Sequence, residues 1–250
     1  MNLRKLAIKY IPLLIIAIMI IALAVINTVT ALNSEDFQTK YPNDTEVTFV
    51  VKSVIKTLPT LITLVVQLLL VSANRNAFLL GGCNAALYGF SYILQGLHFS
   101  AISALLISSP IQIISFFTWR KNSDKKKVIF KRMSPPVFIL TVATMLAGWA
   151  ACYFLLSPFF ADAASPVLDT LTFSIGTVVT VIVAMRYIES QYFNVISCMI
   201  QLVLYIILSN MDPTNISYVV ISAYNLIKVA QAAHSWTRQY MDQRKQSANT

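Results

Sequence analysis

Charged residues are scarce in this chain. Only 12% of its 250 residues are Asp, Glu, Lys or Arg, about half the share found in soluble globular domains, whereas 57% are apolar. The mean hydropathy is +0.68. So little charge cannot cover the surface of a soluble domain, so the composition excludes an ordinary soluble protein and indicates an integral membrane protein.

Cysteine and histidine are almost absent. The three cysteines, Cys83, Cys152 and Cys198, all fall within apolar runs, so we predict no disulfide and no metal site. The two histidines, His98 and His234, are far apart and lie near the ends of apolar runs, without a nucleophile–base set. This scarcity argues against a membrane enzyme, and we expect no cofactor.

Acidic residues are missing from the middle of every apolar run. Asp169 and Glu189 lie near the ends of their runs, and Lys228 is the only charge placed deep in one. A proton-coupled pump usually relies on carboxylates within the membrane. The pattern therefore favours a protein that works without such coupling. The Lys228 amine either extends to the lipid headgroups or contacts a substrate.

Eight apolar runs are long enough to cross a bilayer, because a spanning helix needs about 20 mainly apolar residues. We predict spans at 10–32, 53–72, 77–96, 99–119, 136–156, 167–186, 191–208 and 214–236. The run at 10–32 follows a basic stub, as in a signal peptide, but it exceeds the usual h-region of about 7–15 residues and no small-residue cleavage site follows. We therefore expect an all-α polytopic membrane protein with about eight transmembrane helices.

Nearly all of the positive charge is confined to alternate connections, which is the pattern of cytoplasmic loops. The connections on that side carry Arg4, Lys5, Lys9, Arg75, Arg120, Lys121, Lys125, Lys126, Lys127, Lys131, Arg132, Arg186, Arg238, Arg244 and Lys245. The opposite connections carry Glu35, Asp36, Asp44, Glu46, Asp162 and Asp212, balanced by Lys40, Lys52 and Lys56. We expect both termini in the cytoplasm of a bacterial cell, with the chain in its inner membrane.

The net charge of +9 has a second interpretation, which is that the protein binds nucleic acid. The basic loop has no interleaved aromatic residues, and its charges lie beside predicted spans. We therefore attribute the charge to membrane topology and expect the lipid bilayer, not nucleic acid, as its partner.

A shift of 117 residues brings the second half of the chain into register with the first. The pairs that coincide are Asn84 with Gln201, Leu87-Tyr88 with Leu204-Tyr205, Ser100 with Ser217, and Trp119 with Trp236. Two three-helix blocks with the same orientation form a parallel repeat, which transporters use to place a substrate site near the membrane midplane. We divide the chain into a stub and accessory helix 1–32, connector 33–52, first repeat 53–119, basic loop 120–135, linking helix with its outer loop 136–166, second repeat 167–236 and tail 237–250.

Polar side chains recur within the spans, where they are costly unless they pair or face a cavity. Asn194, Ser197, Gln201 and Tyr205 follow each other at three- and four-residue steps and form one stripe on a helix. The alternative is that such groups only join helices, at about 0.6–2 kcal/mol for each hydrogen bond. We predict a cavity lined by Asn84, Tyr88, Gln112, Asn194, Gln201, Tyr205 and Asn225, with Gln191 and Lys228 nearer the inner side.

Four short motifs follow one another along the chain: Asn84-Ala-Ala-Leu-Tyr88, Gln112-Ile-Ile-Ser-Phe-Phe-Thr-Trp119-Arg-Lys, Leu168-Asp169-Thr-Leu-Thr and Ala184-Met-Arg-Tyr-Ile-Glu189. In order and spacing they resemble the PnuC family of bacterial nicotinamide riboside transporters, over roughly residues 61–236. The resemblance implies a three-plus-one-plus-three helix fold related to the SWEET sugar transporters, an extra N-terminal helix in some members, and often a homotrimer. It also implies facilitated diffusion, with the solute trapped by phosphorylation in the cytosol.

The substrate motif of that family, Trp-x-x-Trp followed four residues later by Asp or Asn, is replaced in this chain. Gln191, Asn194 and Cys198 stand at its three positions, so both stacking indoles are missing. Each stacked ring is worth roughly 1–3 kcal/mol by analogy with base stacking. Amides at these positions favour paired hydrogen bonds with a base or carbonyl edge. Tyr187, Tyr192 and Phe193 supply rings instead if the alignment shifts by one residue.

These observations predict an importer for nicotinamide riboside or a related nucleoside or vitamin precursor, working by alternating access. Cavity residues that are amides, hydroxyls and phenols suit a polar, largely uncharged small molecule that carries hydroxyls and a ring. Thiamine or a deoxynucleoside is an alternative cargo. A substrate-sensing receptor with the same fold is the alternative class, and an uptake assay separates it from a transporter.

Overall fold

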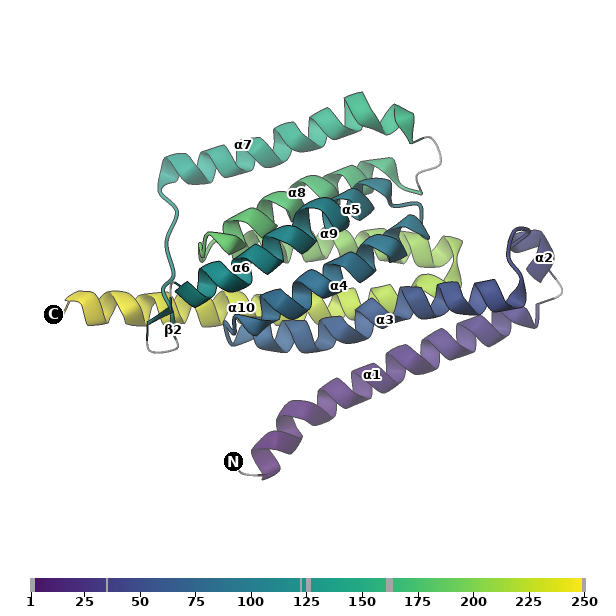
Figure 1. The fold of residues 1–250 in the computed structure, drawn as a ribbon, viewed down its shortest axis with the longest axis horizontal. Helices are drawn as coiled ribbons and strands as arrows, with labels where there is room; N and C mark the ends of the chain where they lie inside the picture. The colour runs from purple at the N-terminus through teal and green to yellow at the C-terminus, as the bar shows by residue number, and fades with distance from the viewer. Residues whose placement is uncertain (1–2, 35, 122, 125–126, 161–163, 249–250) are drawn as a thin grey trace.

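Helices make up almost all of the part of the chain that the computed structural model describes, residues 3–34, 36–121, 123–124, 127–160 and 164–248 (Figure 1). The elements up to the basic loop are α1 Leu3–Leu32, α2 Phe37–Lys40, α3 Glu46–Val71, α4 Asn76–Ile93, α5 His98–Ile102, the π-helical turn η1 Ser103–Ser108 and α6 Ser109–Lys121. The remaining ones are strands β1 Ser123–Asp124 and β2 Lys127–Val128, then α7 Pro135–Ala151, η2 Cys152–Leu156, η3 Ser157–Phe159, α8 Pro166–Ala184, α9 Ser190–Met211, η4 Pro213–Asn215 and α10 Ile216–Ala248. The all-α prediction is confirmed apart from one antiparallel pair of two-residue strands.

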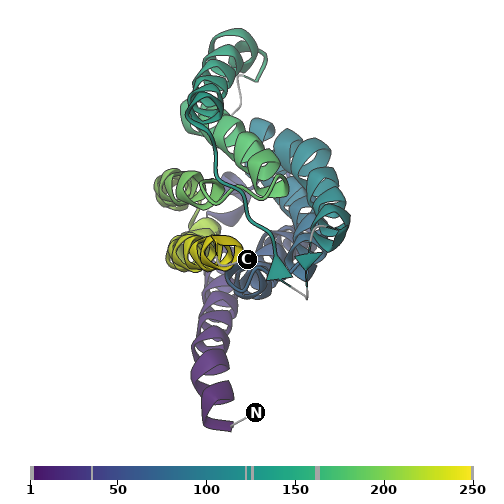
Figure 2. The same ribbon diagram turned by 90° about the vertical axis from the view of Figure 1, so that its left-hand side faces the viewer.

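Six helical segments form a ring, in the order α3, α4, α5–η1–α6, α8, α9 and α10, with α10 packed back against α3. Figure 2 shows this ring along its axis, with α7 on one side and α1 on the opposite side. The linking helix α7 packs on α8, whereas α1 packs on α3 and α10. Each block of three helices therefore contacts the other along two seams, α3 with α10 and α5–α6 with α8.

Among the described residues, seven helices are long and apolar enough to cross a membrane. The eighth predicted span, 77–96, is α4, which has 18 residues but carries Asn76, Asn84 and two tyrosines that lower its hydropathy. It lies between α3 and α6 and packs against both. When α4 is counted as a span because of its position in the ring, the described residues contain the expected eight spans.

Local sequence signals fix several helix ends. Helix α3 begins seven residues before the predicted span because the Thr45 hydroxyl accepts a hydrogen bond from the Thr48 N–H, 3.2 Å away, and so caps the helix. Helices α7 and α8 have proline in their first turn, where the missing N–H costs nothing. Helix α10 continues twelve residues past the predicted end at 236, as a polar helix beyond the ring.

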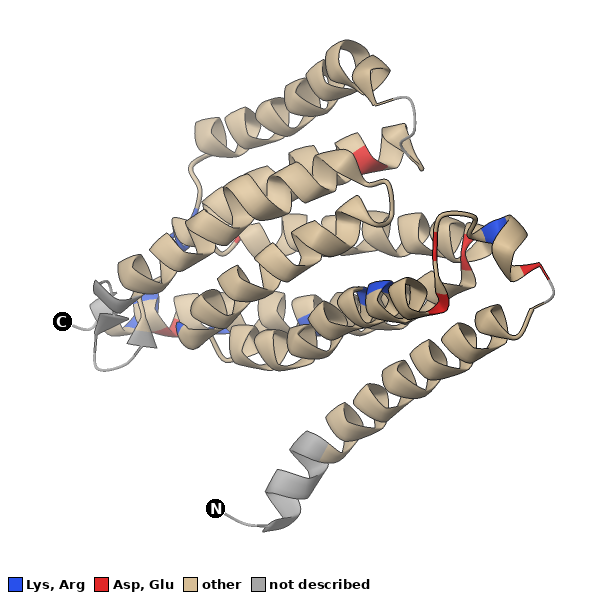
Figure 3. Ribbon diagram, turned by 45° about the vertical axis from the view of Figure 1, so that its right-hand side comes forward, with Lys and Arg blue, Asp and Glu red and all other residues tan. Residues whose placement is uncertain are grey.

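The two ends of the ring differ in charge. Helix α1 starts and α10 finishes at one end, which we name the tryptophan end after Trp119 and Trp236 (Figure 1). Most of the described Asp and Glu residues lie at the opposite end, which we name the carboxylate end after Asp169 and Asp212 (Figure 3). Glu35, Lys125, Lys126 and Asp162 of the predicted charge pattern lie outside the described residues.

Candidate functional site

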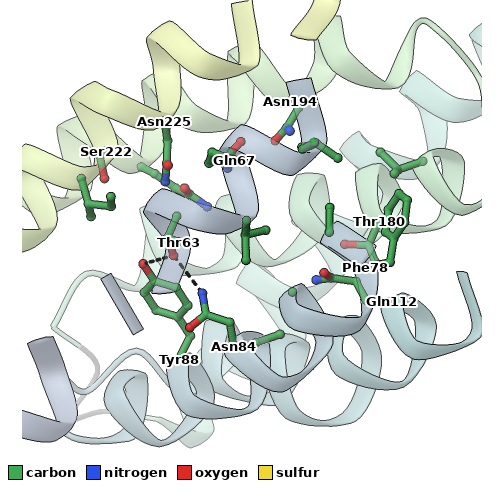
Figure 4. Close-up of a pocket in the computed structure, with 18 of the residues that line it drawn as sticks. Thr63, Gln67, Phe78, Asn84, Tyr88, Gln112, Thr180, Asn194, Ser222 and Asn225 are labelled. Carbon is green, nitrogen blue, oxygen red and sulfur yellow. Dashed lines mark hydrogen bonds between the residues drawn. The ribbon is translucent and has the colours of Figure 1, made fainter. Parts of the chain in front are cut away.

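A polar cavity of about 250 Å³ lies inside the ring of six helices (Figure 4). Every ring helix contributes to its wall. The polar and aromatic lining residues are Thr63, Gln67, Phe78, Asn84, Tyr88, Tyr92, Gln112, Ser115, Thr180, Asn194, Gln201, Tyr205, Ser222 and Asn225. None of the described residues that line it is Asp, Glu, Lys, Arg or His.

A second compartment of about 210 Å³ continues from the first toward Ser100 and Thr172, at the carboxylate end. The two compartments share the side chains of Tyr88, Gln112 and Asn194 among others. The π-helical turn η1 lies against this second compartment and supplies Ser103 and Ser108 to its wall. Widened turns of this kind are common at functional sites, because they turn side chains off the regular helix face.

Seven of the nine residues predicted for the site line this cavity: Asn84, Tyr88, Gln112, Asn194, Gln201, Tyr205 and Asn225. They come from four helices, α4, α6, α9 and α10. Asn84 and Gln201, the repeat-related pair, therefore reach the same space from opposite blocks. That each of them contacts a cargo stays a prediction.

Gln191 and Lys228 do not line the described cavity. Gln191 lies in the first turn of α9 with its side chain fully buried, and both amide atoms lack a hydrogen-bond partner among the described residues. Lys228 is half-buried on α10, where its ammonium donates to Gln231 Oε1 over 3.0 Å and lies 5.5 Å from the Tyr224 ring centre. Neither residue therefore forms part of the described cavity wall, and their part in binding stays a prediction.

The hydroxyl of Thr63 joins α3 to α4 at the cavity wall. It donates to the Pro59 carbonyl one turn earlier over 2.8 Å. Its oxygen is 2.8 Å from Asn84 Nδ2 and 3.0 Å from the Tyr88 hydroxyl. Sequence reasoning missed Thr63 because a lone threonine in a helix usually bonds only its own backbone. One sequence signal was available, because the shift of 117 residues places Thr180 on Thr63. Thr180 lines the same cavity.

Close packing of α4 brings these groups together. A Cβ atom on Gly82 would lie 2.8 Å from Ile113 Cγ1, so only glycine allows α6 to come so near. A Cβ on Gly81 would collide with the Gln112 amide oxygen, the end of a flexible side chain. The glycines of α4 therefore leave room for α6 and for the Gln112 amide beside the cavity.

Aromatic rings close the cavity at the tryptophan end. Phe78 lines the cavity, and its ring centre is 4.4 Å from that of Trp119. Trp119 and Trp236, the repeat-related pair, are both fully buried with ring centres 5.4 Å apart. Phe130 packs against both, 6.0 Å from Trp119 and 4.9 Å from Trp236. This cluster separates the cavity from the end of the ring.

Residues 128–133, which we name the strap, cross that end of the ring from α6 toward α7 (Figure 2). The Phe130 N–H donates to Gln243 Oε1 over 3.1 Å, and Gln243 Nε2 donates to the Val128 carbonyl over 2.6 Å. The Ile188 N–H donates to the Lys131 carbonyl over 3.0 Å. The strap thus ties α10 and the α8–α9 turn to the aromatic cluster.

Charged groups close both seams at the carboxylate end. The Lys56 ammonium of α3 lies 3.0 Å from Asp212 Oδ2 and donates to the Thr214 hydroxyl over 3.2 Å. On the other seam, the fully buried Asp169 of α8 accepts from the N–H groups of Phe99 and Ser100, at 2.9 and 3.0 Å. Because Asp169 satisfies free N–H groups at the start of α5, it joins that helix to α8.

Asp212 lies in the connection between α9 and α10, outside the spanning segments. Burial alone would raise the pKa of its carboxyl, but the Lys56 charge and hydrogen bonds from Thr214 and Lys56 outweigh burial and hold the pKa below its usual 3.8. Tyr41 donates to Asp212 Oδ1 over 3.3 Å, and burial together with the nearby carboxylates of Asp212 and Asp44 raises its pKa to about 12. Asp212 is therefore ionised and Tyr41 neutral near pH 7.

No group of three or more His, Cys, Asp or Glu residues is close enough to hold a metal ion in the described part of the chain. The three cysteines are free, Cys83 exposed and Cys152 and Cys198 buried. The site can therefore bind a solute through amides, hydroxyls and aromatic rings, and its own residues supply no acid–base pair.

Comparisons with known proteins agree with this architecture. The family model described as nicotinamide mononucleotide transporter matches residues 53–238. The chain is similar in fold to the crystal structure of the vitamin B3 transporter PnuC, with a TM-score of 0.65 at 17% identity, over 91% of this chain and 92% of that one. No curated protein matches the chain at a significant level. On the family match over most of its length, the chain belongs to the nicotinamide mononucleotide transporter family and is a multi-pass membrane transporter.

Proposed function

We propose that this transporter imports an unphosphorylated, nucleoside-type vitamin precursor of the nicotinamide riboside class. One observation carries the proposal: a cavity within the ring is lined from all six helices by amides, hydroxyls and phenols, with no acidic or basic side chain. Such a wall can pair with ribose hydroxyls and a carboxamide. The solved relative is a vitamin B3 transporter, and that title supports the same class of cargo here.

The phosphorylated form of this cargo fits the cavity poorly. A phosphate monoester carries about −1.5 to −2 charges near pH 7. Burying such a charge without a cation costs several kcal/mol, and the lining residues include no Lys, Arg or His. Lys228 is already engaged by Gln231 outside the cavity. We therefore assign the riboside, and not the mononucleotide that the family description names, as the cargo.

Tyrosines take over the stacking surface that the missing Trp-x-x-Trp motif supplies elsewhere in the family. Tyr88 and Tyr92 line the cavity with ring centres 5.5 Å apart and planes inclined by 27°. Tyr205 lies beside them, and its hydroxyl donates to that of Tyr92 over 3.1 Å. A pyridinium or other heteroaromatic ring can stack against these faces. Of the three replaced positions, only Asn194 lines the cavity.

The transport cycle in this proposal is passive alternating access. With no carboxylate in the cavity wall, nothing there binds a proton or cation in exchange for the cargo. The two blocks separate at the tryptophan end or at the carboxylate end in turn. Both termini lie in the cytoplasm of a bacterial inner membrane, and the protein assembles as a homo-oligomer, a trimer by family resemblance.

Uptake into proteoliposomes tests the proposal. The purified protein is expected to equilibrate radiolabelled nicotinamide riboside in a saturable way, and to carry nicotinamide mononucleotide at least about tenfold more slowly. Asn194→Leu, in the cavity wall, should reduce riboside uptake without reducing expression. Asn210→Leu is the matched control, because Asn210 lies on the same helix but is exposed outside the cavity.

Two results would contradict the assignment. If no nucleoside or vitamin of a broad panel enters the vesicles, the chain is not an importer of this class. If the mononucleotide enters as fast as the riboside, the exclusion of phosphate is wrong. Equal uptake by the wild type and Asn194→Leu would remove Asn194 from the site.

A further inference from the structure

The hydroxyl of Thr63 has one proton, and the structure shows where it goes. Thr63 Oγ1 lies 2.8 Å from the Pro59 carbonyl oxygen, which can only accept. The proton is therefore used within α3. Toward the cavity wall, Thr63 is left with lone pairs, so it can accept hydrogen bonds from α4 but cannot donate one.

This constraint orients the Asn84 amide. The atom of Asn84 that lies 2.8 Å from Thr63 must be the amide nitrogen, because two acceptors would repel. By the same reasoning the Tyr88 hydroxyl, 3.0 Å from Thr63, donates its proton to Thr63. Asn84 Oδ1 is then left buried without a partner among the described residues, on a side chain that is 4% exposed and lines the cavity (Figure 4).

The other unpartnered amides at the wall are not held in this way. Gln67 Oε1 and Asn225 Oδ1 are also buried without a partner, but no hydrogen bond to a described residue fixes which edge of either amide faces the cavity. Thr180, the repeat-related residue, donates to the Gly176 carbonyl over 2.8 Å and has the Ser108 hydroxyl at 3.4 Å. It accepts like Thr63, but it orients no amide.

We infer that Thr63 is a specificity-determining positioning residue, which fixes Asn84 Oδ1 as an acceptor for a hydrogen-bond donor on the cargo's heteroaromatic ring. The inference rests on the proposed function and names the part of the cargo that Asn84 recognises. Asn84 lies one helical turn from Tyr88, which stacks on Tyr92. A ring placed on these tyrosines directs a primary carboxamide N–H at Asn84 Oδ1. A ring substituent without a donor leaves this acceptor unpaired, and unpaired buried groups are penalised strongly.

Two probes of equal charge and nearly equal shape test whether Asn84 Oδ1 recognises a donor on the cargo's ring. Nicotinamide riboside carries a carboxamide, and 3-acetylpyridine riboside has a methyl group in place of the NH₂. The measured quantity is the ratio of the two transport efficiencies in proteoliposomes, which does not depend on the amount of protein. The wild type is expected to prefer the carboxamide by about tenfold or more.

Four variants locate the source of that preference. Thr63→Val removes the acceptor at almost constant shape, frees the Asn84 amide to turn, and should reduce the ratio to about threefold or less. Thr63→Ser keeps the hydroxyl and should restore the wild-type ratio. Thr57→Val is the matched control, because Thr57 makes the same bond to the carbonyl four residues earlier on the same helix, 2.8 Å long, away from the cavity. Asn84→Leu removes the acceptor itself and should bring the ratio close to one.

The outcomes separate this inference from the proposed function. An unchanged ratio in Thr63→Val overturns the role of Thr63, and an unchanged ratio in Asn84→Leu overturns it even if Thr63→Val fails to fold. A wild type that carries both probes equally well overturns the inference but leaves riboside transport standing. A wild type that carries neither probe overturns the proposed function itself.

Discussion

The two ends of the ring are closed by different physical means. At the tryptophan end, the rings of Phe78, Trp119, Phe130 and Trp236 pack together. The Arg132–Glu189 pair at this end is long, at 3.8 Å, and its arginine is exposed. At the carboxylate end, the Lys56–Asp212 pair joins α3 to the α9–α10 connection. Packing depends on shape and buried area, whereas an ion pair depends on charge state and salt.

This difference gives the two ends different sensitivities. Loss of one ring at the tryptophan end leaves a void that salt or pH does not change. The carboxylate end responds to acid, because one of its two seams depends on an ionised Asp212. Mutations and pH can therefore weaken one end while the other stays closed, and the predictions below compare them in order of expected effect.

Trp119→Ala should produce the largest loss of stability. Trp119 is fully buried and contacts Phe78, Phe130 and Trp236, so truncation should cost about 3–5 kcal/mol in free energy of unfolding. Denaturant titration of the purified protein in detergent measures this loss. Trp149→Ala is the control, since Trp149 is only half-buried on α7 and stacks on Tyr153. Equal losses in the two variants would show that the aromatic cluster is not special.

Lys56→Met should have the next largest effect. It leaves the Asp212 carboxylate half-buried without its cation, which we expect to cost about 2 kcal/mol. Lys52→Met is the matched control on the same helix, because Lys52 also pairs with an aspartate, Asp44, but its own side chain is 42% exposed against 10% for Lys56. That variant should change the free energy of unfolding by less than about 0.5 kcal/mol. A Lys52→Met loss as large as that of Lys56→Met would contradict the account of this seam.

Acid should weaken the Lys56–Asp212 seam at the carboxylate end and leave the packing of the four aromatic rings at the tryptophan end unchanged. The pKa of Asp212 in the folded protein is below its usual 3.8, so its contribution to stability is present above about pH 4 and is lost as pH falls through the folded pKa. The difference in melting temperature between wild type and Asp212→Asn should therefore shrink as the pH is lowered from 6 to 3. The difference between wild type and Trp119→Ala should stay constant over that range. A constant Asp212→Asn difference would refute the assigned role of the carboxylate.

Gln243→Ala should have the smallest effect of the set. It removes two hydrogen bonds between the strap and α10, and we expect a loss of about 1 kcal/mol. Gln239→Ala, one turn earlier, is the control, because Gln239 bonds Ser235 on its own helix and not the strap. If Gln239→Ala destabilises the protein as much, the strap contributes no more than any polar contact on this helix.

The fold was largely predictable from hydropathy and charge. Apolar runs separated by short polar connections placed the helices, and the shift of 117 residues paired Trp119 with Trp236. That pairing gave no reason to expect the two rings to touch, which depends on where the two blocks meet in space. The extension of α10 beyond 236 was also missed. Its polar residues led to the prediction of a tail at 237–250, whereas Gln243 lies on the helix and contacts the strap.

The site was predictable in part for the same reason. Amides and phenols within spans must be paired or face a cavity, and seven of the eight amides and phenols predicted for the site do line one. Gln191 was included because it stands at the first position of the replaced Trp-x-x-Trp motif; it lies outside the described cavity wall, and its part in binding stays a prediction. Lys228 was included for its charge, but it finds Gln231 on its own helix. Thr63 was missed because its role depends on neighbours in α4 that the α3 sequence does not reveal.

Equilibrium binding to the purified protein tests most directly whether this uncharged cavity holds the cargo. Titration calorimetry should show one nicotinamide riboside bound per chain, at least about tenfold weaker binding in Asn225→Leu, and no measurable binding of nicotinamide mononucleotide. Binding of the mononucleotide with equal affinity, or riboside binding that is unaffected by Asn225→Leu, would contradict the account.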